Sequence, residues 1–319
     1  MGIADITSTL TQAPGLLKMF KDLKPRPAST ADCVAARVEE TAAKFPDHTA
    51  VIFEGQTLTW RELNQLANRY ASCFRRIGLV RGDTVSLMME NRIEYLGVVI
   101  ATNKLGITAA LLNTNLVGRP LSHCMSITNS RMCILGEERL QAIADLKAQG
   151  ELADIAEFIF VPDQGETDCP GWALNLEEEA ADEESGNPPE TAETTMAETA
   201  LYIFTSGTTG LPKAAVLSNK RYLLTATLSA KGGLMCDEND CIYLCLPLYH
   251  GTGLFLGVGA ACCTGASMFI RRKFSASSFL PDVREHGATC FIYIGELCRY
   301  LLNTPEHEED YKNPLGTMM

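Results

Sequence analysis

The sequence has 319 residues, of which 46% are hydrophobic and 21% are charged, as is typical of a globular protein with more than one compact unit. The formal net charge is −12, but 12 acidic residues lie between residues 163 and 198, where there is no Lys or Arg. Outside that segment acidic and basic residues number 27 each. The sequence therefore lacks the basic surface that binds nucleic acid, and we exclude nucleic acid as a partner.

None of the 12 cysteines belongs to a Cys-x-x-Cys pair, and the closest group is Cys236, Cys241 and Cys245. A zinc site on that group would need a spaced His pair that the sequence lacks. Most of the other cysteines lie in apolar stretches, where a reduced thiol acts as a small hydrophobic side chain. We therefore predict buried free thiols, no metal site and a reducing compartment.

Residues 1–29 predict a short lead-in helix. Leu16, Met19, Phe20 and Leu23 fall on one helical face, and basic residues surround them. Such a helix can lie on the cytoplasmic face of a membrane, although docking on its own domain is the interpretation that we favour. The N-terminus lacks the long apolar core of a secretory signal. We expect a cytoplasmic protein, with peripheral membrane contact left open.

Residues 30–162 alternate between predicted helices and short apolar strands, which indicates an α/β fold with a largely parallel sheet. Asp32 is the expected cap of the first helix, and Glu54-Gly55 is the expected turn after the first strand. Helices are expected at residues 32–44, 61–77, 94–105 and from residue 121, and strands at residues 49–53, 84–88, 108–112 and 132–135. We assign this stretch to a first α/β subdomain.

Residues 163–198 interrupt the alternation with their acidic excess and with Pro188-Pro189, and they predict an exposed linker or a partly disordered loop. A strand at residues 199–204 then opens a second α/β subdomain over residues 199–319. Within it, the uncharged stretch after His250 is long enough to span a bilayer, but five glycines dilute its hydrophobicity. We expect a buried helix and strand there.

A loop rich in Gly, Ser and Thr follows the strand at residues 199–204. Its sequence is Thr205-Ser206-Gly207-Thr208-Thr209-Gly210-Leu211-Pro212-Lys213. Glycines let backbone N–H groups approach an anion closely, the hydroxyl groups add donors, and Lys213 adds a positive charge. The spacing fits neither the Walker A loop nor the Rossmann fingerprint. The loop therefore predicts a polyphosphate site of another kind.

This loop resembles the phosphate-binding signature of adenylate-forming enzymes, and two other segments agree with it in order. These are Leu58-Thr59-Trp60-Arg61-Glu62-Leu63 upstream and Leu246-Pro247-Leu248-Tyr249-His250 downstream. Residues 112–116, 272–277 and 293–303 are similar to the very-long-chain acyl-CoA synthetase and fatty acid transport protein branch. The resemblance covers residues 30 to 305. It implies the acyl-CoA synthetase-like adenylation fold, with largely parallel sheets flanked by helices.

The resemblance also implies a reaction and its site residues. A fatty carboxylate would attack the α-phosphate of Mg-ATP and CoA would then displace AMP, so fatty acid, ATP, Mg²⁺ and CoA are the expected partners. The residues that hold the β- and γ-phosphates would be Thr205, Ser206, Gly207, Thr208, Thr209, Gly210 and Lys213. The catalytic residue between the acyl and nucleotide sites would be His250, and the residues that contact the acyl substrate would be Tyr249, Tyr293 and Gly295.

The later elements of the resembled family do not occur in this sequence. They are a Tyr-Gly-x-Thr-Glu stretch, a Thr-Gly-Asp element and a small C-terminal domain with a catalytic lysine. We therefore interpret the chain as the front part of a ligase, with the C-terminal half missing and residual phosphate binding at most. A membrane-bound fatty acid uptake protein and a non-catalytic binding remnant stay open as alternatives. Acyl chain length and oligomeric state are left undetermined.

Overall fold

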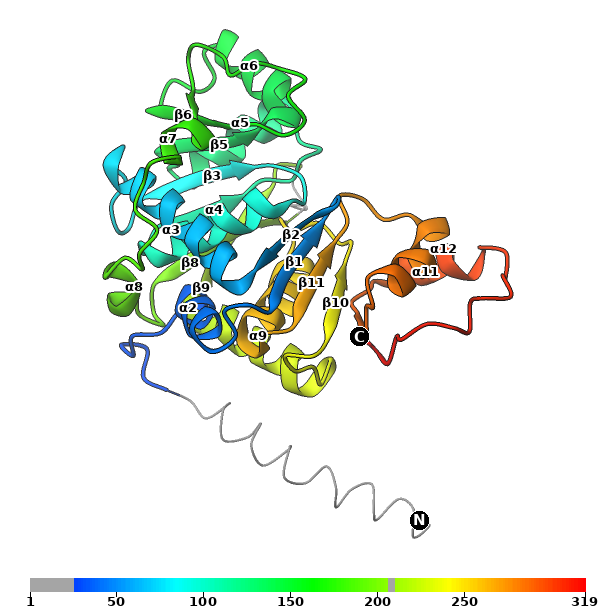
Figure 1. Cartoon of the computed structure of the whole chain (residues 1–319). Helices are drawn as coiled ribbons and strands as arrows, with labels where there is room; N and C mark the ends of the chain where they lie inside the picture. Colours follow the sequence, from blue (N-terminus) through cyan, green and yellow to red (C-terminus); the bar gives the residue numbers. More distant parts are fainter. Residues whose placement is uncertain (1–25, 206–209) are drawn as a thin grey trace.

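The computed structural model describes residues 26–205 and 210–319, which form two β-sheets with helices between and around them (Figure 1). The lead-in helix predicted within residues 1–29 rests on residues 16–23, which lie outside the described part. In the described part, no helix combines the length and the apolar character that crossing a lipid bilayer requires.

The larger sheet has seven strands in the order β7-β6-β5-β3-β4-β8-β9. All neighbours pair in parallel except β8 and β9, which form an antiparallel hairpin. The strands are β3 (Thr84–Met88), β4 (Thr108–Leu111), β5 (Met132–Gly136), β6 (Glu157–Val161), β7 (Leu174–Asn175), β8 (Thr199–Thr205) and β9 (Lys213–Ser218). Helices cover both faces of the sheet, and β3 and β5 are accordingly buried at every residue.

The smaller sheet has six strands in the order β13-β12-β10-β11-β1-β2, and only β1 and β2 pair antiparallel. Its strands come from both ends of the chain, because β1 lies parallel to β11 with Val51 beside Met268. The strands are β1 (Thr49–Phe53), β2 (Gln56–Thr59), β10 (Cys241–Leu244), β11 (Ser267–Ile270), β12 (Cys290–Phe291) and β13 (Thr317–Met318).

A layer of helices separates the two sheets. α3 packs on β1 and β2, α4 packs on β4, and α3 and α4 contact each other. The α-helices are α2 (Val34–Lys44), α3 (Trp60–Arg76), α4 (Ile93–Lys104), α5 (Gly118–Ile127), α6 (Leu140–Ala148), α7 (Leu176–Ala180), α8 (Glu190–Glu193), α9 (Asn219–Leu228), α10 (Gly259–Thr264), α11 (Ala276–Glu285) and α12 (Gly295–Leu302). A 3₁₀-helix, η1 (Glu137–Arg139), and two π-helices, η2 (Ser229–Gly233) and η3 (Thr252–Val258), complete the list.

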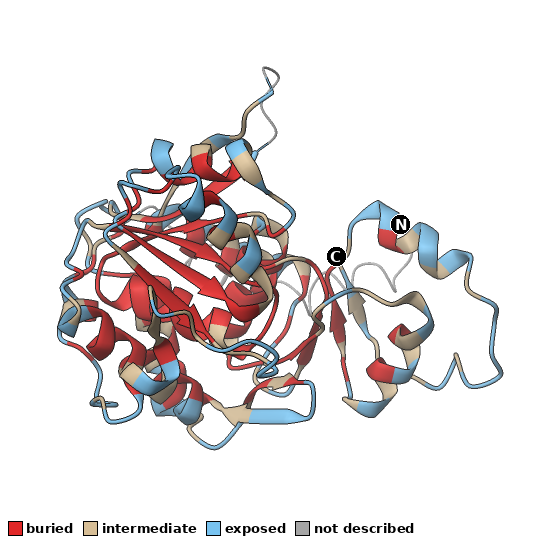
Figure 2. Ribbon diagram, turned by 90° about the horizontal axis from the view of Figure 1, so that it is seen from above, coloured by how far each residue is buried: buried red, intermediate tan, exposed pale blue. Residues whose placement is uncertain are grey.

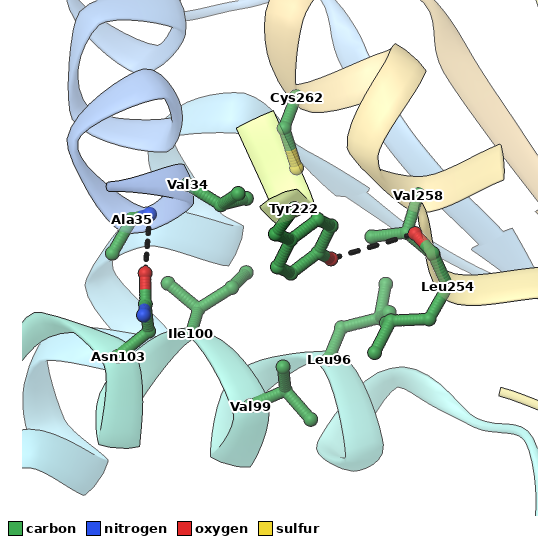
Figure 3. A pocket seen from close by; sticks show the side chains of 10 residues that line it. All are labelled: Val34, Ala35, Leu96, Val99, Ile100, Asn103, Tyr222, Leu254, Val258 and Cys262. Atoms are coloured by element: carbon green, nitrogen blue, oxygen red, sulfur yellow. Dashed lines mark hydrogen bonds between the residues drawn. The ribbon is translucent and has the colours of Figure 1, made fainter. Parts of the chain in front are cut away.

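The buried residues concentrate on the strands and on the helix faces turned toward them (Figure 2). Between the sheets, α2, α4, α9 and η3 meet around Tyr222, whose hydroxyl donates to the Leu254 carbonyl at 3.4 Å (Figure 3). Beside it, the side-chain oxygen of Asn103 accepts from the Ala35 N–H at 3.0 Å. The cavity left among these apolar side chains is about 10 Å³, the volume of one water at most. This region is therefore packed core and cannot hold an acyl chain.

Several local predictions from the sequence are confirmed. The Glu54-Gly55 turn has φ of 45° and 82°. The helix expected at residues 61–77 is α3, which begins with a capping box in which Thr59 and Glu62 exchange hydrogen bonds. All 12 cysteines are free, and nine of them are buried. Residues 259–270 form the buried helix and strand expected after His250. The predicted cap is wrong, because Cys33 precedes α2 and Asp32 instead pairs with Arg26 and Arg37.

The predicted division into subdomains at residues 30–162 and 199–319 does not follow the sheets. Residues 49–59 form β1 and β2 of the smaller sheet, although the later strands of the first stretch belong to the larger one. Residues 199–218 form β8 and β9 of the larger sheet, because Ala109 of β4 pairs with Leu201 of β8. Each sheet therefore combines strands from both stretches.

The acidic segment at residues 163–198 combines exposed loops with ordered elements. It contains β7, which extends the larger sheet through pairing of Ile159 with Leu174, and the short helices α7 and α8. Its acidic side chains meet arginines from the end of α3 and beyond: Arg76 pairs with Glu179 at 2.7 Å and with Glu183 at 2.5 Å. Arginines distant in the sequence thus neutralise a charge excess that looks uncompensated along the chain.

Candidate functional site

The loops that follow the strands of the two sheets meet at one junction. In a parallel sheet the carboxyl ends of the strands share one edge, and α/β proteins bind ligands outside that edge. The loop after β3 contacts the loops after β10 and β11, since the Asn91 side-chain N–H₂ donates to the carbonyls of Leu246 at 3.0 Å and Arg271 at 3.1 Å. The two carboxyl edges therefore face a common region.

The predicted phosphate loop connects β8 to β9 beyond this edge. Thr205 and Lys213 pair with each other at the loop end of the hairpin, and both are exposed. Gly210 has φ of +98°, a conformation that side chains rarely adopt, and is also exposed. The backbone carbonyl of Pro212 lies 3.2 Å from Nε2 of His123 on α5. The other loop residues of the predicted site, Ser206, Gly207, Thr208 and Thr209, lie outside the described residues.

His250 lies at the end of the segment that follows β10. Its N–H donates to the Pro247 carbonyl at 3.1 Å, and its own carbonyl accepts from Leu254 at 3.1 Å. The π-helix η3 begins directly afterwards, and a Cβ placed on Gly251 would lie 3.8 Å from Cδ1 of Ile203. Ile203 is on β8, two residues before Thr205, so the His250 segment packs against the strand that enters the phosphate loop.

The ring of His250 lies 4.7 Å from that of Tyr249, and the protein around it lowers the imidazole pKa by removing water. The imidazole is therefore neutral at pH 7. Tyr249 is buried, which raises the pKa of its hydroxyl despite a side-chain hydrogen bond with Thr114. Thr114 follows β4, so Tyr249 and His250 connect the smaller sheet to the neighbours of β8.

Tyr293 and Gly295 lie one strand away along the same edge. They follow β12, which pairs in parallel with β10. Tyr293 is half-buried, and its N–H donates to the Met319 carbonyl at 3.0 Å. Gly295 begins α12, and a Cβ added there would meet open space. Within the described residues, no hydrogen bond or ring contact joins either of them to His250, and their assignment to the acyl pocket stays a prediction.

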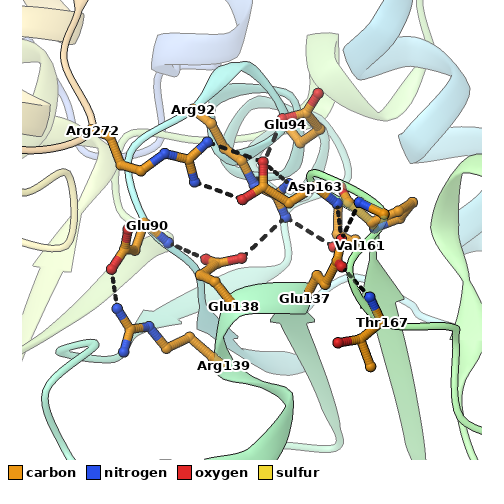
Figure 4. Close-up of polar contacts among 12 residues, drawn as sticks. Glu90, Arg92, Glu94, Glu137, Glu138, Arg139, Val161, Asp163, Thr167 and Arg272 are labelled. Atoms are coloured by element: carbon orange, nitrogen blue, oxygen red, sulfur yellow. Dashed lines mark hydrogen bonds and ion pairs between the residues drawn. The ribbon is translucent and has the colours of Figure 1, made fainter. Parts of the chain in front are cut away.

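A buried charge network at the junction was not anticipated from the sequence (Figure 4). Arg92 has only 1% of its side chain exposed and donates to the carbonyls of Val161 at 2.9 Å and Pro162 at 2.6 Å. Its guanidinium also lies 3.3 Å from Asp163 and 3.7 Å from Glu138. The sequence offered one signal for this network: Arg92, Glu138 and Asp163 each come shortly after a predominantly buried strand.

Arg272 closes this network from the smaller sheet. It binds Asp163 through two nitrogens at 2.6 and 3.0 Å and Glu54 through two nitrogens at 2.9 and 3.0 Å. Glu54 lies in the β1–β2 turn and Asp163 follows β6, so one guanidinium joins the two sheets. The described residues contain no cluster of His, Cys, Asp or Glu arranged to hold a metal ion, and we assign no Mg²⁺ ligand among them.

The two α/β sheets carry the phosphate-loop hairpin and the His250 segment beyond their strand ends, an arrangement that fits an adenylate-forming fold. Residues 38–318 match the AMP-binding enzyme family, so this chain belongs to that family. The family prediction is confirmed.

Two curated relatives illustrate the branch. The chain is 34% identical over 289 residues to the medium/long-chain-fatty-acid–CoA ligase FadD6 of Mycobacterium tuberculosis, covering 90% of this chain and 46% of the relative. It is 36% identical over 270 residues to the long-chain fatty acid transport protein 1 of Bos taurus, covering 83% of this chain and 41% of the relative. The chain thus spans less than half the length of these relatives.

Solved structures agree on the fold. The inhibitor-bound N-terminal domain of FACL13 from Mycobacterium tuberculosis superposes with a TM-score of 0.76 at 22% identity, covering 86% of this chain and 66% of that one. The anthranilate CoA ligase AuaEII in complex with anthranoyl-AMP gives a TM-score of 0.79 at 21% identity, covering 92% and 54%. The predicted fold class, the front part of the adenylation fold, is confirmed.

Proposed function

We propose that this chain supplies the phosphate loop and the histidine segment of an AMP-forming ligase that activates long or very long fatty acids. In the first step an oxygen of the fatty carboxylate bonds to the α-phosphorus of ATP, and pyrophosphate leaves. In the second step the CoA sulfur bonds to the acyl carbon of the adenylate, AMP leaves, and the thiol proton is released. The relatives' printed names support the acyl substrate.

One observation carries the proposal: the Thr205–Lys213 hairpin loop opens at the carboxyl edge of β8, against which the His250 segment packs. A polyphosphate held by the loop would have its α-phosphate end free to face His250. Thr205, Gly210 and Lys213 are exposed, as ligand contact requires. Mg²⁺ would accompany ATP as part of the substrate and offset phosphate charge.

The chemistry suits the residues present. A carboxylate is a weak nucleophile, so catalysis depends on alignment and on stabilising charge at the phosphates. Lys213 would contribute positive charge without transferring a proton. His250 would border the acyl and nucleotide sites as a neutral imidazole, which adds no charge near the acyl chain. Tyr249, Tyr293 and Gly295 would line the acyl side.

ATP–pyrophosphate exchange with a panel of fatty acids tests the proposal. It is measured on the 319-residue chain and on a form extended to the length of the relatives. We expect exchange in the extended form, strongest with long acyl chains, and phosphate binding at most in the shorter chain. Exchange in the shorter chain would show that adenylation needs less of the fold, and exchange in neither form would contradict the ligase proposal.

A matched pair of lysine variants tests the loop itself. Lys213→Ala removes the charge at the end of the loop, whereas Lys220→Ala removes an exposed charge at the start of α9. Losing one charge-assisted contact to phosphate should weaken ATP binding by roughly 10- to 100-fold. The Lys220 variant should match the wild type, and equal effects of both variants would contradict the assignment.

Fatty acid uptake at a membrane is the second candidate, because several relatives are named long-chain fatty acid transport proteins. Uptake and ligation are compatible, since conversion to the CoA ester traps the acid inside the cell. We propose a cytoplasmic location and leave peripheral membrane contact open. Uptake that stays at the wild-type rate in a Lys213→Ala variant whose ligation rate has fallen would favour a separate transport activity.

A further inference from the structure

Asn91 connects the two sheets with its complete set of side-chain hydrogen-bonding groups. It follows β3 of the larger sheet and is 4% exposed. Its amide N–H₂ donates to the carbonyls of Leu246 at 3.0 Å and Arg271 at 3.1 Å, and its oxygen accepts from the Leu248 N–H at 2.9 Å. All three contacts are to backbone groups beyond β10 and β11 of the smaller sheet.

These contacts flank the turn that carries His250. Leu246 and Leu248 lie on either side of Pro247, which has no backbone N–H and so cannot donate a hydrogen bond of its own. The Pro247 carbonyl in turn accepts from the His250 N–H at 3.1 Å. Asn91 therefore holds the backbone on both sides of Pro247, and the Pro247 carbonyl holds the His250 N–H.

The residues on both sides of Asn91 bond to the loops that follow strands of the larger sheet. The Glu90 backbone N–H donates to the Glu138 carboxylate at 2.6 Å, and the Arg92 side chain donates to the carbonyls of Val161 and Pro162. Asn91 is consequently a rigid arm and not a side chain on a loose loop. The Asn91 side chain contacts the segment that packs against β8, the strand that enters the phosphate loop.

We infer that Asn91 is a positioning residue, which sets the distance between the His250 segment and the phosphate loop. The inference rests on the proposed function, because the positioning matters for adenylation only if those two elements act on one substrate. Other side chains cannot replace it: Asp lacks the two donors, Leu lacks all three groups, and Gln is one methylene too long for the same three contacts.

Kinetic comparison of two buried asparagines tests the inference. Asn91→Ala removes the contacts to the His250 segment. The control is Asn68→Ala on α3, where the buried amide also makes two donor contacts, to Ser185 at 2.8 Å and Asn187 at 2.9 Å, at the outer acidic segment. Both variants lose comparable hydrogen bonds, so a general loss of stability should affect them alike.

In the form of the protein that catalyses ATP–pyrophosphate exchange, Asn91→Ala should lower kcat about tenfold or more, because small displacements of reacting groups are costly. The KM for ATP should stay within about twofold, since the phosphate loop itself is unchanged. Asn68→Ala should keep the wild-type kcat. An unchanged kcat in Asn91→Ala, or an equal fall in both variants, would overturn the inference.

A second readout does not depend on catalysis. Amide hydrogen exchange at Leu248 and His250 should accelerate about tenfold or more in Asn91→Ala, because an intramolecular hydrogen bond is lost, and should stay unchanged in Asn68→Ala. Asn91→Asp keeps the acceptor for Leu248 but loses both donors, so it serves if the alanine variant unfolds. It should accelerate exchange at His250 as well, and wild-type exchange at both amides would overturn the inference.

The two readouts separate the two failures. Faster amide exchange in Asn91→Ala without any ATP–pyrophosphate exchange in the wild type would refute the proposed function and retain the structural coupling. Pyrophosphate exchange in the wild type with an unaffected Asn91→Ala variant would retain the function and refute the positioning role.

Discussion

Glu137 offers a strong test of how the junction between the sheets is built. Its carboxylate follows β5 and accepts hydrogen bonds from the backbone N–H groups of Asp163 at 2.6 Å, Gly165 at 3.1 Å and Thr167 at 2.6 Å (Figure 4). The first of these holds the residue that pairs with Arg272 of the smaller sheet. Replacing Glu137 with Gln keeps the size of the side chain but removes the charge and turns one acceptor into a donor.

The expected loss is large for an isosteric change. Hydrogen bonds to charged groups contribute about 1.5–3 kcal/mol each, and Gln can retain part of the set, so we expect Glu137→Gln to lower the free energy of unfolding by about 2–4 kcal/mol at pH 7. Burial opposes ionisation of Glu137, but the N–H groups of Asp163, Thr167 and Gly165 outweigh it and lower the carboxyl pKa. The wild-type advantage is therefore complete above the ordinary Glu pKa of about 4.3 and is lost as pH falls through the lowered pKa.

Urea unfolding at several pH values provides the measurement, because Gln does not titrate and the two curves should converge in acid. Glu166→Gln is the matched control, since it removes a charge from an exposed side chain on the loop whose N–H groups bind Glu137. Equal stability of Glu137→Gln and wild type at pH 7 would refute the reasoning. A difference that persists unchanged below the lowered pKa would show that packing, and not the charge, is responsible.

Three further predictions concern the surroundings of the site. Gly253→Ala should lose about 1–3 kcal/mol of stability by urea unfolding, because its Cβ would lie 2.8 and 2.9 Å from two backbone carbonyl oxygens. Gly251→Ala should lose less, because its Cβ would lie 3.3 Å from the Phe255 ring, a milder overlap. Equal losses would contradict this prediction. Asp282→Asn should lower the free energy of unfolding by about 1–3 kcal/mol, because the carboxylate accepts from the Tyr243 hydroxyl at 2.8 Å and from the partly exposed guanidinium of Arg271. An unchanged urea midpoint would count against this prediction. His250 should titrate by NMR below the ordinary His pKa of about 6.5, because burial lowers its pKa. The folded protein should therefore lose stability as pH falls from the ordinary pKa through the lowered one. A measured His250 pKa at or above 6.5 would refute this prediction.

The elements that sequence reasoning located are those with local causes. The strand predicted at residues 84–88 matches β3, in which the three apolar residues Val85, Leu87 and Met88 are buried. Thr59 and Glu62 form the capping box at the start of α3 three residues apart. The helix predicted at residues 94–105 matches α4 to within one residue at each end. Such signals lie within a few residues of the element they define.

The errors have non-local causes. The pairing of β1 with β11 depends on complementary faces more than two hundred residues apart, which no local pattern encodes. The acidic segment seemed too charged to fold, but its partners, such as Arg76, lie a hundred residues earlier. Arg92 carries a charge that would ordinarily be exposed, yet backbone carbonyls and carboxylates surround it. Each case needs knowledge of which distant groups meet.

The candidate site likewise has a part with a local sequence signal and a part without one. Its ligand-facing loop was recognisable because Thr205 to Lys213 is contiguous in sequence, whereas the groups that hold the site together come from several loops of both sheets. A fixed distance between a phosphate loop on one sheet and His250 on the other cannot be set by either sheet alone. It requires side chains that cross the junction, and Asn91 and Arg272 cross it with directional bonds to both sides. Residues that bind a ligand can thus be found by motif, while residues that position them are found only once the chain is folded.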